Sequence, residues 1–125
     1  MAITRTYVGR AQYDFDIDGG AQEAITVAQN FTLPIGAMII GCWTDIKTTL
    51  AGAGSTLALA IGGVTLNAAA NFDAAEYVGI DYHLARTTAA LTTSSGSVVV
   101  TIGGATVSAG KMDIYVEYLL ADWSV

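Results

Sequence analysis

Apolar and polar residues alternate along much of this 125-residue chain with a period of two, which is typical of β-strands that bury one face. The alternation is clearest in residues 12–17, where Tyr13, Phe15 and Ile17 form the apolar set, and in residues 111–118. Other segments are rich in Val, Ile and Thr and are also predicted to be strands: 24–28, 38–48, 56–61, 64–66, 97–102 and 105–107. About eight strands therefore predict an all-β fold.

Two Gly-Gly pairs predict tight hairpins. Gly62-Gly63 and Gly103-Gly104 each separate two apolar runs, and glycine reaches the positive φ that a two-residue hairpin needs. The two segments also match each other at an offset of 41 residues, from Ile61 to Leu66 and from Ile102 to Val107. This match fits two similar hairpins in the two sheets of a sandwich, although convergent turn chemistry explains it almost as well.

The remaining segments are predicted to connect the strands or to form a recognition site. Residues 67–86 show the least periodicity, so we expect a short helix or an ordered loop there, and a site of recognition. Residues 33–36 predict a turn that enters the strand near Met38, and residues 87–96 predict a connection. We interpret residues 1–10 as an N-terminal arm or first strand, and residues 11–125 as a single sandwich domain.

The composition is unusual for a free monomer. Only 13% of the residues are charged, against about 25% in an average soluble chain. Apolar residues make up 53% of the chain, and alanine alone accounts for 21 positions. Such a bland, weakly hydrated surface is suited to burial against other subunits.

The net charge of −6 disfavours nucleic acid and anionic membranes as partners. No apolar run reaches the ~18 residues of a membrane span, and the first ten residues lack the apolar stretch of a secretory signal. The single cysteine, Cys42, cannot form an internal disulfide. We therefore expect a soluble, non-exported protein that is stabilised by packing and assembly.

One acidic segment resembles the first half of a calcium-binding loop. Asp14, Asp16 and Asp18 alternate ahead of Gly19, as the ligands of such loops do. The second half fails because Ile25 stands where a bidentate glutamate is required. The three aspartates are thus weak metal candidates, and the alternatives are the polar face of a strand or an acidic edge used in assembly.

No residue set predicts catalysis or a cofactor. His83 is the only histidine, and its spacing from nearby acids matches no metal motif. Cys42 lies in an apolar strand pattern, where an inert thiol is expected rather than a nucleophile. We therefore expect a protein that is not an enzyme and has no small-molecule substrate.

The aromatic residues are candidates either for stacking on sugars or for anchoring an interface. Trp43 and Tyr115 fall opposite the more apolar face of their strands, and Trp123 lies in the tail. The N-terminal segment and residues 67–86 are the other expected contact elements. The predicted interface residues are Arg5, Tyr7, Arg10, Trp43, Tyr77, Tyr82, Tyr115 and Trp123.

Several turn and strand-end motifs resemble a known family. They are 13–15 with 18–20, then 33–37, then 58–62, and finally 108–111 leading into 115–118. In this order they are similar to small virion structural proteins of tailed bacteriophages, especially minor capsid, head decoration or cement proteins. The similarity spans residues 13–119.

The resemblance implies a jelly-roll-like sandwich that binds the outside of a capsid shell, commonly as trimers at local threefold positions. The expected partners are further copies of the chain, as a homotrimer, and the major capsid protein, whose neighbouring capsomers it would bridge. The protein would be made in the host cytoplasm and would reside on the outer capsid surface of the virion. The alternatives are a head fibre base or tail component, and a carbohydrate-binding module that uses exposed aromatics and calcium.

Overall fold

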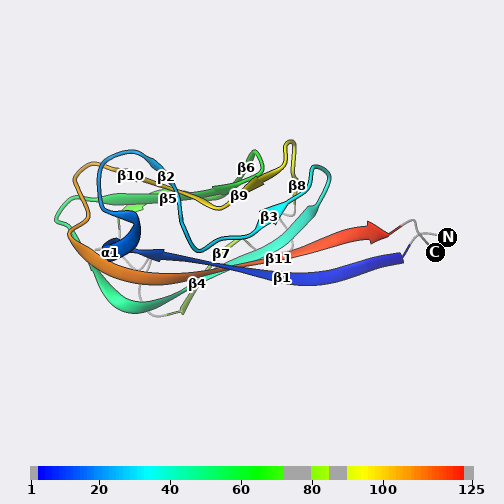
Figure 1. The fold of residues 1–125 in the computed structure, drawn as a ribbon, viewed down its shortest axis with the longest axis horizontal. Coiled ribbons are helices and arrows are strands. Elements are labelled where there is room, and N and C mark those ends of the chain that lie inside the picture. The colour runs from blue at the N-terminus through cyan, green and yellow to red at the C-terminus, as the bar shows by residue number, and fades with distance from the viewer. Residues whose placement is uncertain (1–2, 72–79, 85–89, 123–125) are drawn as a thin grey trace.

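The computed structural model describes residues 3–71, 80–84 and 90–122, which form antiparallel sheets arranged as a sandwich (Figure 1). The longer strands are β1 (Ile3–Asp14), β2 (Ala24–Thr26), β4 (Met38–Ala51), β5 (Thr56–Ile61), β6 (Val64–Asn71), β7 (Ile80–Leu84), β10 (Val99–Gly103) and β11 (Ala109–Asp122). The short elements in these ranges are α1 (Phe15–Asp18), β3 (Thr32–Leu33), β8 (Ala90–Leu91) and β9 (Gly96–Ser97). The predicted all-β sandwich is confirmed.

The strands pair in a nested order. One sheet runs β1-β11-β4-β7, with β8 paired to β4, and the other runs β2-β10-β5-β6, while β3 pairs with β9. Among the eight longer strands, the first therefore pairs with the last, the second with the seventh, the third with the sixth and the fourth with the fifth. This nesting is compatible with the predicted jelly roll, and it places the first and last strands side by side.

Alternate residues of the strands form one continuous core between the two sheets, as the period of two requires. Tyr13 is fully buried in it, and its hydroxyl donates a 2.6 Å hydrogen bond to the carbonyl oxygen of Gly19. The largest buried side chains are Tyr13, Leu33, Ile39, Leu57, Leu59, Ile61, Leu66, Val98, Val100, Met112, Ile114 and Val116.

The first Gly-Gly hairpin is confirmed, and the second is wrong. Gly62 and Gly63 have positive φ and join β5 to β6. After Gly103 the chain instead leaves the sheet, and residues 105–107 form no strand. Their carbonyls are satisfied by a side chain, because the Ser55 hydroxyl lies 2.9 Å from the oxygens of both Ala105 and Thr106. The matching segments do not occupy different sheets either, since β5 and β10 are neighbours in one sheet.

Two further segments differ from the sequence prediction. The first strand ends at Asp14, and the expected strand residues 15–17 form α1, so Ile17 points to solvent. Within residues 67–86, β6 extends to Asn71 and residues 80–84 form β7, where a helix or loop was expected. These alanine-rich and polar residues carry little periodicity, but they pair with β5 and β4 respectively. The rest of that segment lies outside the described residues.

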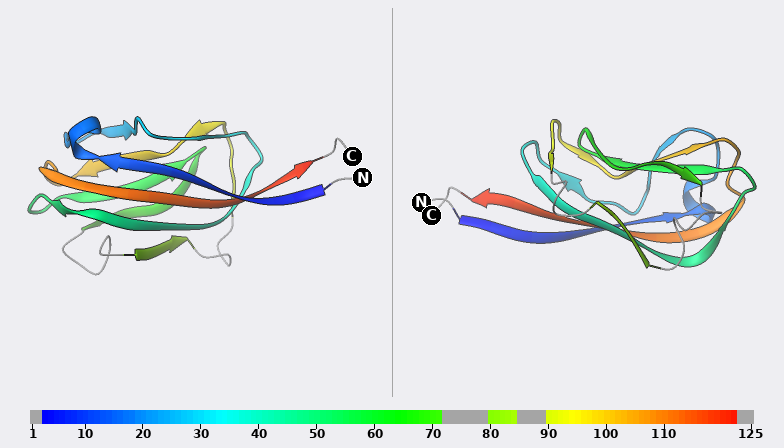
Figure 2. Two further views of the ribbon diagram at one scale, coloured as in Figure 1. Left: turned by 60° about the horizontal axis from the view of Figure 1, so that its bottom comes forward. Right: turned by 180° about the vertical axis from the view of Figure 1, so that it is seen from behind.

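Strands β1 and β11 are long, and together they extend past the sandwich as a two-stranded ribbon (Figures 1 and 2). They pair without interruption from Ile3 opposite Asp122 to Asp14 opposite Lys111. The paired residues Ile3 and Asp122 lie at the outer end of this ribbon, and α1 lies at the other end of the same sheet. The sheet therefore has two distinct ends, the ribbon and the α1 end.

Candidate functional site

One face of the five-stranded sheet points away from the core, and we call it the outer face. Three aligned residues on neighbouring strands cross it in a row: Arg10 on β1, Tyr115 on β11 and Trp43 on β4. The rings of Trp43 and Tyr115 stack with centroids 5.4 Å apart and planes 13° apart. Because each ring covers one face of the other, the two partly buried side chains support each other on the outer face.

A charged network lies beside this row. The Asp113 carboxylate accepts hydrogen bonds from the Arg10 guanidinium at 2.8 Å and from the Gln12 amide at 2.7 Å, although Asp113 is only 2% exposed. Burial pushes the pKa of Asp113 upward, but the bonds from Arg10 and Gln12 outweigh it, so its pKa lies below its usual value. Asp113 is therefore an anion at neutral pH and fixes the position of the Arg10 side chain.

The ribbon carries an aromatic stack on its core-side face. Tyr118 on β11 stacks against Tyr7 on β1, with centroids 5.5 Å apart, and against Phe31, with centroids 6.4 Å apart. Phe31 packs so closely over Gly9 that a Cβ atom at that position would require the Phe31 ring to shift. Tyr7 remains 40% exposed at the edge strand of the sheet, and Val8 on the other face of the strand is 53% exposed.

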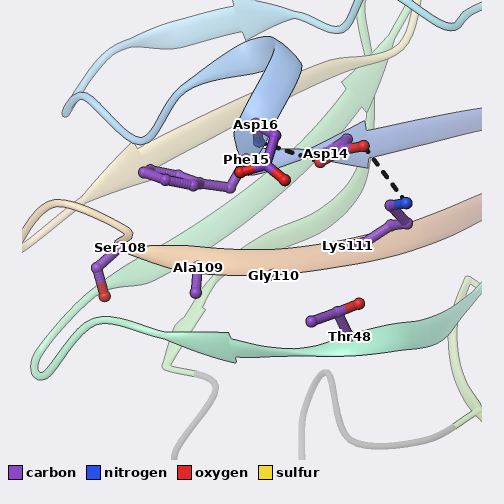
Figure 3. Close-up of a pocket in the computed structure, with 8 residues that line it drawn as sticks. All are labelled: Asp14, Phe15, Asp16, Thr48, Ser108, Ala109, Gly110 and Lys111. Carbon is purple, nitrogen blue, oxygen red and sulfur yellow. Dashed lines mark hydrogen bonds and ion pairs between the residues drawn. The ribbon is translucent and has the colours of Figure 1, made fainter.

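A pocket of about 220 Å³ lies at the α1 end, and we call it the α1 pocket (Figure 3). Asp14, Lys111 and Thr48 cross its floor on three aligned strands. The Lys111 ammonium lies 3.5 Å from an Asp14 carboxylate oxygen, which is a long ion pair. Its other lining residues are Phe15, Asp16, Ser108, Ala109 and Gly110.

The aspartates of the calcium-like segment do not converge on one point. Asp14 caps α1, because its carboxylate accepts a 3.0 Å hydrogen bond from the backbone N–H of Asp16. Asp18 accepts bonds from the backbone N–H groups of Asp14 and Ala28, at 3.0 and 2.8 Å. No group of three or more His, Cys, Asp or Glu residues within the described ranges is arranged to hold a metal ion. In this structure the segment forms a capping turn.

Cys42 and His83 are the remaining residues with side chains that could take part in catalysis. Cys42 is fully buried in the core, and burial raises the pKa of its thiol to about 12. The thiolate needed for nucleophilic attack is therefore not formed near neutral pH. His83 lies on β7, and its Nε2 is 2.6 Å from the hydroxyl oxygen of Thr44.

The predicted interface residues fall into three groups. Arg5 and Tyr7 are exposed on the ribbon, and Arg10, Trp43 and Tyr115 form the row on the outer face. Tyr82 lies on β7 opposite Trp43, so the row continues in register to a fourth strand. Tyr77 and Trp123 lie outside the described residues.

The chain shares its fold with proteins of phage capsids. Neither a protein-family model nor a curated protein sequence matches it. A chain of the acid-stable capsid of Helicobacter pylori bacteriophage KHP30 aligns with a TM-score of 0.56 and 20% identity, over 96% of this chain and 94% of that one. A chain of the cyanophage Pam1 capsid asymmetric unit aligns with a TM-score of 0.64 and 19% identity, over 94% of this chain and 86% of that one.

Sequence reasoning missed two parts of the site. Asp113 and Gln12 were not singled out, because a carboxylate on the polar side of a strand reads as an ordinary solvated residue. Lys111 and Thr48 were not connected with Asp14, since 97 residues separate Asp14 from Lys111 in the chain and only strand register brings them together. The long intervals between these residues hold no local signal of that register.

Among the described residues, no helix has the length and apolar character of a membrane span.

Proposed function

We propose that this protein is a bacteriophage virion structural protein, and more specifically a capsid decoration or cement protein that is not an enzyme. The observation that carries the proposal is the shared sandwich, which spans nearly the whole of this chain and most of each matched chain in the capsids of phages KHP30 and Pam1. The low-charge composition supports it, because such a surface suits repeated burial in an assembly.

In this proposal the protein binds the outer surface of the shell, contacts the major capsid protein and bridges neighbouring capsomers as a homotrimer. The outer face of the five-stranded sheet is suited to such a contact, since stacked rings and the ion pair between the half-exposed Arg10 and the buried Asp113 hold its side chains in place before binding. Arginine and aromatic residues are also the types most enriched at interface hot spots. The function is mechanical: bound copies resist the outward pressure of the packed genome.

The proposal is tested on particles that lack the protein. Purified protein is added back, and the temperature at which the particles release their genome is measured with and without chelator. We expect binding and a higher release temperature. Trp43→Ala should weaken binding, whereas Ile35→Ala, a matched change of an exposed residue in the 33–36 turn, should not. Particles that neither bind the protein nor gain heat resistance would contradict the proposal.

Another virion role predicts a different copy number. A head fibre base or tail component would also suit the low-charge composition, but it attaches at a unique vertex. Quantifying the protein per particle separates these roles, because a cement protein is present at a copy number comparable to that of the capsid subunits.

A further inference from the structure

Strand β1 has an open backbone edge. It is the first strand in the order β1-β11-β4-β7, so among the described strands it has a sheet neighbour on one side only. In an antiparallel ladder, alternate residues direct their N–H and C=O groups toward the partner strand, and the residues between them direct these groups away. The N–H of Gln12 donates to the carbonyl oxygen of Gln29 at 2.9 Å and not to β11, so the even-numbered residues of β1 face the open edge. Before Gln12 these are Thr4, Thr6, Val8 and Arg10.

This open edge lies on the ribbon, where the sandwich supports β1 least (Figures 1 and 2). Two antiparallel strands alone are marginally stable in water, and further strands are normally needed. Natural edge strands are commonly short, or they carry a proline, a lysine or a bulge that prevents further pairing. β1 is 12 residues long, contains neither proline nor lysine, and pairs with β11 without a bulge. Its Tyr7 and Val8 remain 40% and 53% exposed, so the ribbon is suited to receive another strand.

The ribbon is also the part of this acidic chain that a second copy can approach without charge repulsion. Residues 3–10 carry two arginines, and the residues 115–122 that pair with them carry Glu117 and Asp122. These charges cancel, whereas the whole chain has a net charge of −6. Two ribbons can therefore meet although the two whole chains repel each other.

We propose that the β1 edges of two copies pair antiparallel across a two-fold axis beside Thr6. The residues with open backbone groups are also those on the outer face, because Ala11 and Tyr13 between them point into the core. The axis is therefore perpendicular to the sheet, and the outer faces of both copies stay on the same side. The strands β11-β1-β1-β11 form one continuous sheet in which neither copy keeps an open β1 edge on its ribbon.

The side chains favour this register over its neighbours. A pairing centred on Arg5 would place the two copies of Arg5 directly opposite each other, and like charges in that position destabilise a sheet. A pairing centred nearer to Gln12 would bring the second copy against Gln29, which already occupies that end of the edge. Centring on Thr6 avoids both and places Arg5 opposite Tyr7, where a guanidinium and an aromatic ring attract each other.

This contact joins copies in pairs, so it is separate from the threefold contact of the proposed function. Where trimers form, it links one trimer to the next through their projecting ribbons. The inference does not rest on the cement role, since the open edge is a property of the chain itself.

The test uses substitutions that block the edge without disturbing β11. Thr6→Pro removes an N–H that points away from β11, and proline is tolerated at such a position of an edge strand while a second strand is excluded. Thr6→Lys places like charges opposite each other across the axis. Thr65→Lys is the matched control, because Thr65 is exposed on β6, an edge strand of the other sheet. Light scattering behind size exclusion is run on the full chain at several concentrations, and thermal unfolding checks that each variant is folded.

We expect the wild type and Thr65→Lys to form pairs whose mass falls by half on dilution. Each Thr6 variant should stay folded and dissociate at a concentration about tenfold higher or more, because the symmetric contact loses the same interaction twice. A wild type that forms no pairs at any concentration, or Thr6 variants with the wild-type mass, would overturn the inference. A wild type that forms no pairs but loses binding to particles on Thr6→Pro would also overturn it, and would assign the edge to an extended segment of the shell. Failure of the cement role is distinct, as paired wild-type protein that neither binds nor stabilises particles.

Discussion

At the scale of single residues, Asp113 shows how a polar face becomes a fixed surface. Its side chain points away from the core, yet Arg10 and Gln12 cover it and donate to it at 2.8 and 2.7 Å. A buried carboxylate is tolerated only when such donors replace water. The ordered surroundings of Trp43 and Tyr115 follow from this network, since Arg10 lies beside Tyr115 in the strand register.

Asp113 should also make stability depend on pH. Its folded pKa lies below the unfolded value of about 3.9, so its contribution is fully present above that value and is lost as the pH falls toward the folded pKa. We expect Asp113→Asn to unfold more easily than the wild type at pH 7, by roughly 1–2 kcal/mol because Arg10 is half exposed. Denaturant unfolding at several pH values measures the difference, which should shrink below about pH 4. Parallel curves for the two proteins down to pH 2 would show that Asp113 is not stabilised as an anion.

Cys42 leads to a second prediction at this scale. Burial raises the pKa of its thiol to about 12, and the residue has no exposed surface. We expect no reaction of the native protein with a thiol reagent at pH 8, and one equivalent of reaction after addition of denaturant. Rapid reaction of the native protein, at the rate of a free thiol, would mean that the core around β4 opens readily.

At the scale of elements, the α1 turn shows where the pattern misled the sequence analysis. The period of two continues through Ile17, so a strand was predicted, but the strand stops because Asp14 caps a helical turn and Gly19 ends it. An aspartate at the N-cap and a glycine after the last turn are known helix signals. Both signals are present in the sequence, but the alternation of apolar and polar residues was given more weight than either of them.

The capping turn provides a prediction with a matched control. Asp18 accepts two backbone hydrogen bonds, one from the end of β1 and one from Ala28, whereas the neighbouring Asp16 side chain is exposed. Asp18→Ala leaves both N–H groups without their acceptor and should lower the free energy of unfolding by roughly 2 kcal/mol. Asp16→Ala should change it by about 0.5 kcal/mol or less. Chemical denaturation of both variants measures the contrast, and equal losses would contradict this role of Asp18.

The hairpins show a second limit of sequence reasoning. Gly62-Gly63 was predicted correctly because its turn is local and both flanking strands are next to it in the chain. Gly103-Gly104 has the same chemistry, but the residues that follow find hydrogen-bond partners in Ser55 and Gly20 rather than in β10. Partners that lie ~50 and ~90 residues away leave no trace in a local pattern.

At the scale of the whole molecule, the fold class was predictable and the strand order was not. Alternation identifies strands and their buried faces, and residues such as Tyr13, Ile114 and Val116 are core residues as predicted. Register is different, because the pairing of β1 with β11 joins two strands that lie about 100 residues apart in the chain. The row on the outer face and the α1 pocket both depend on that register. Their residues could be named as candidates from the sequence, but they could not be assembled into sites.

The terminal pairing also predicts how the protein tolerates truncation. Residues 5–8 of β1 are exposed and pair with β11 on the ribbon, whereas residues 11–13 include the buried Ala11 and Tyr13. Removing residues 1–8 should therefore leave a folded sandwich with a thermal midpoint a few degrees lower, while removing residues 1–14 should abolish the cooperative transition because it opens the core. Thermal unfolding followed by circular dichroism distinguishes the two. A 9–125 fragment without a cooperative transition, or a 15–125 fragment that keeps one, would contradict this account of the core.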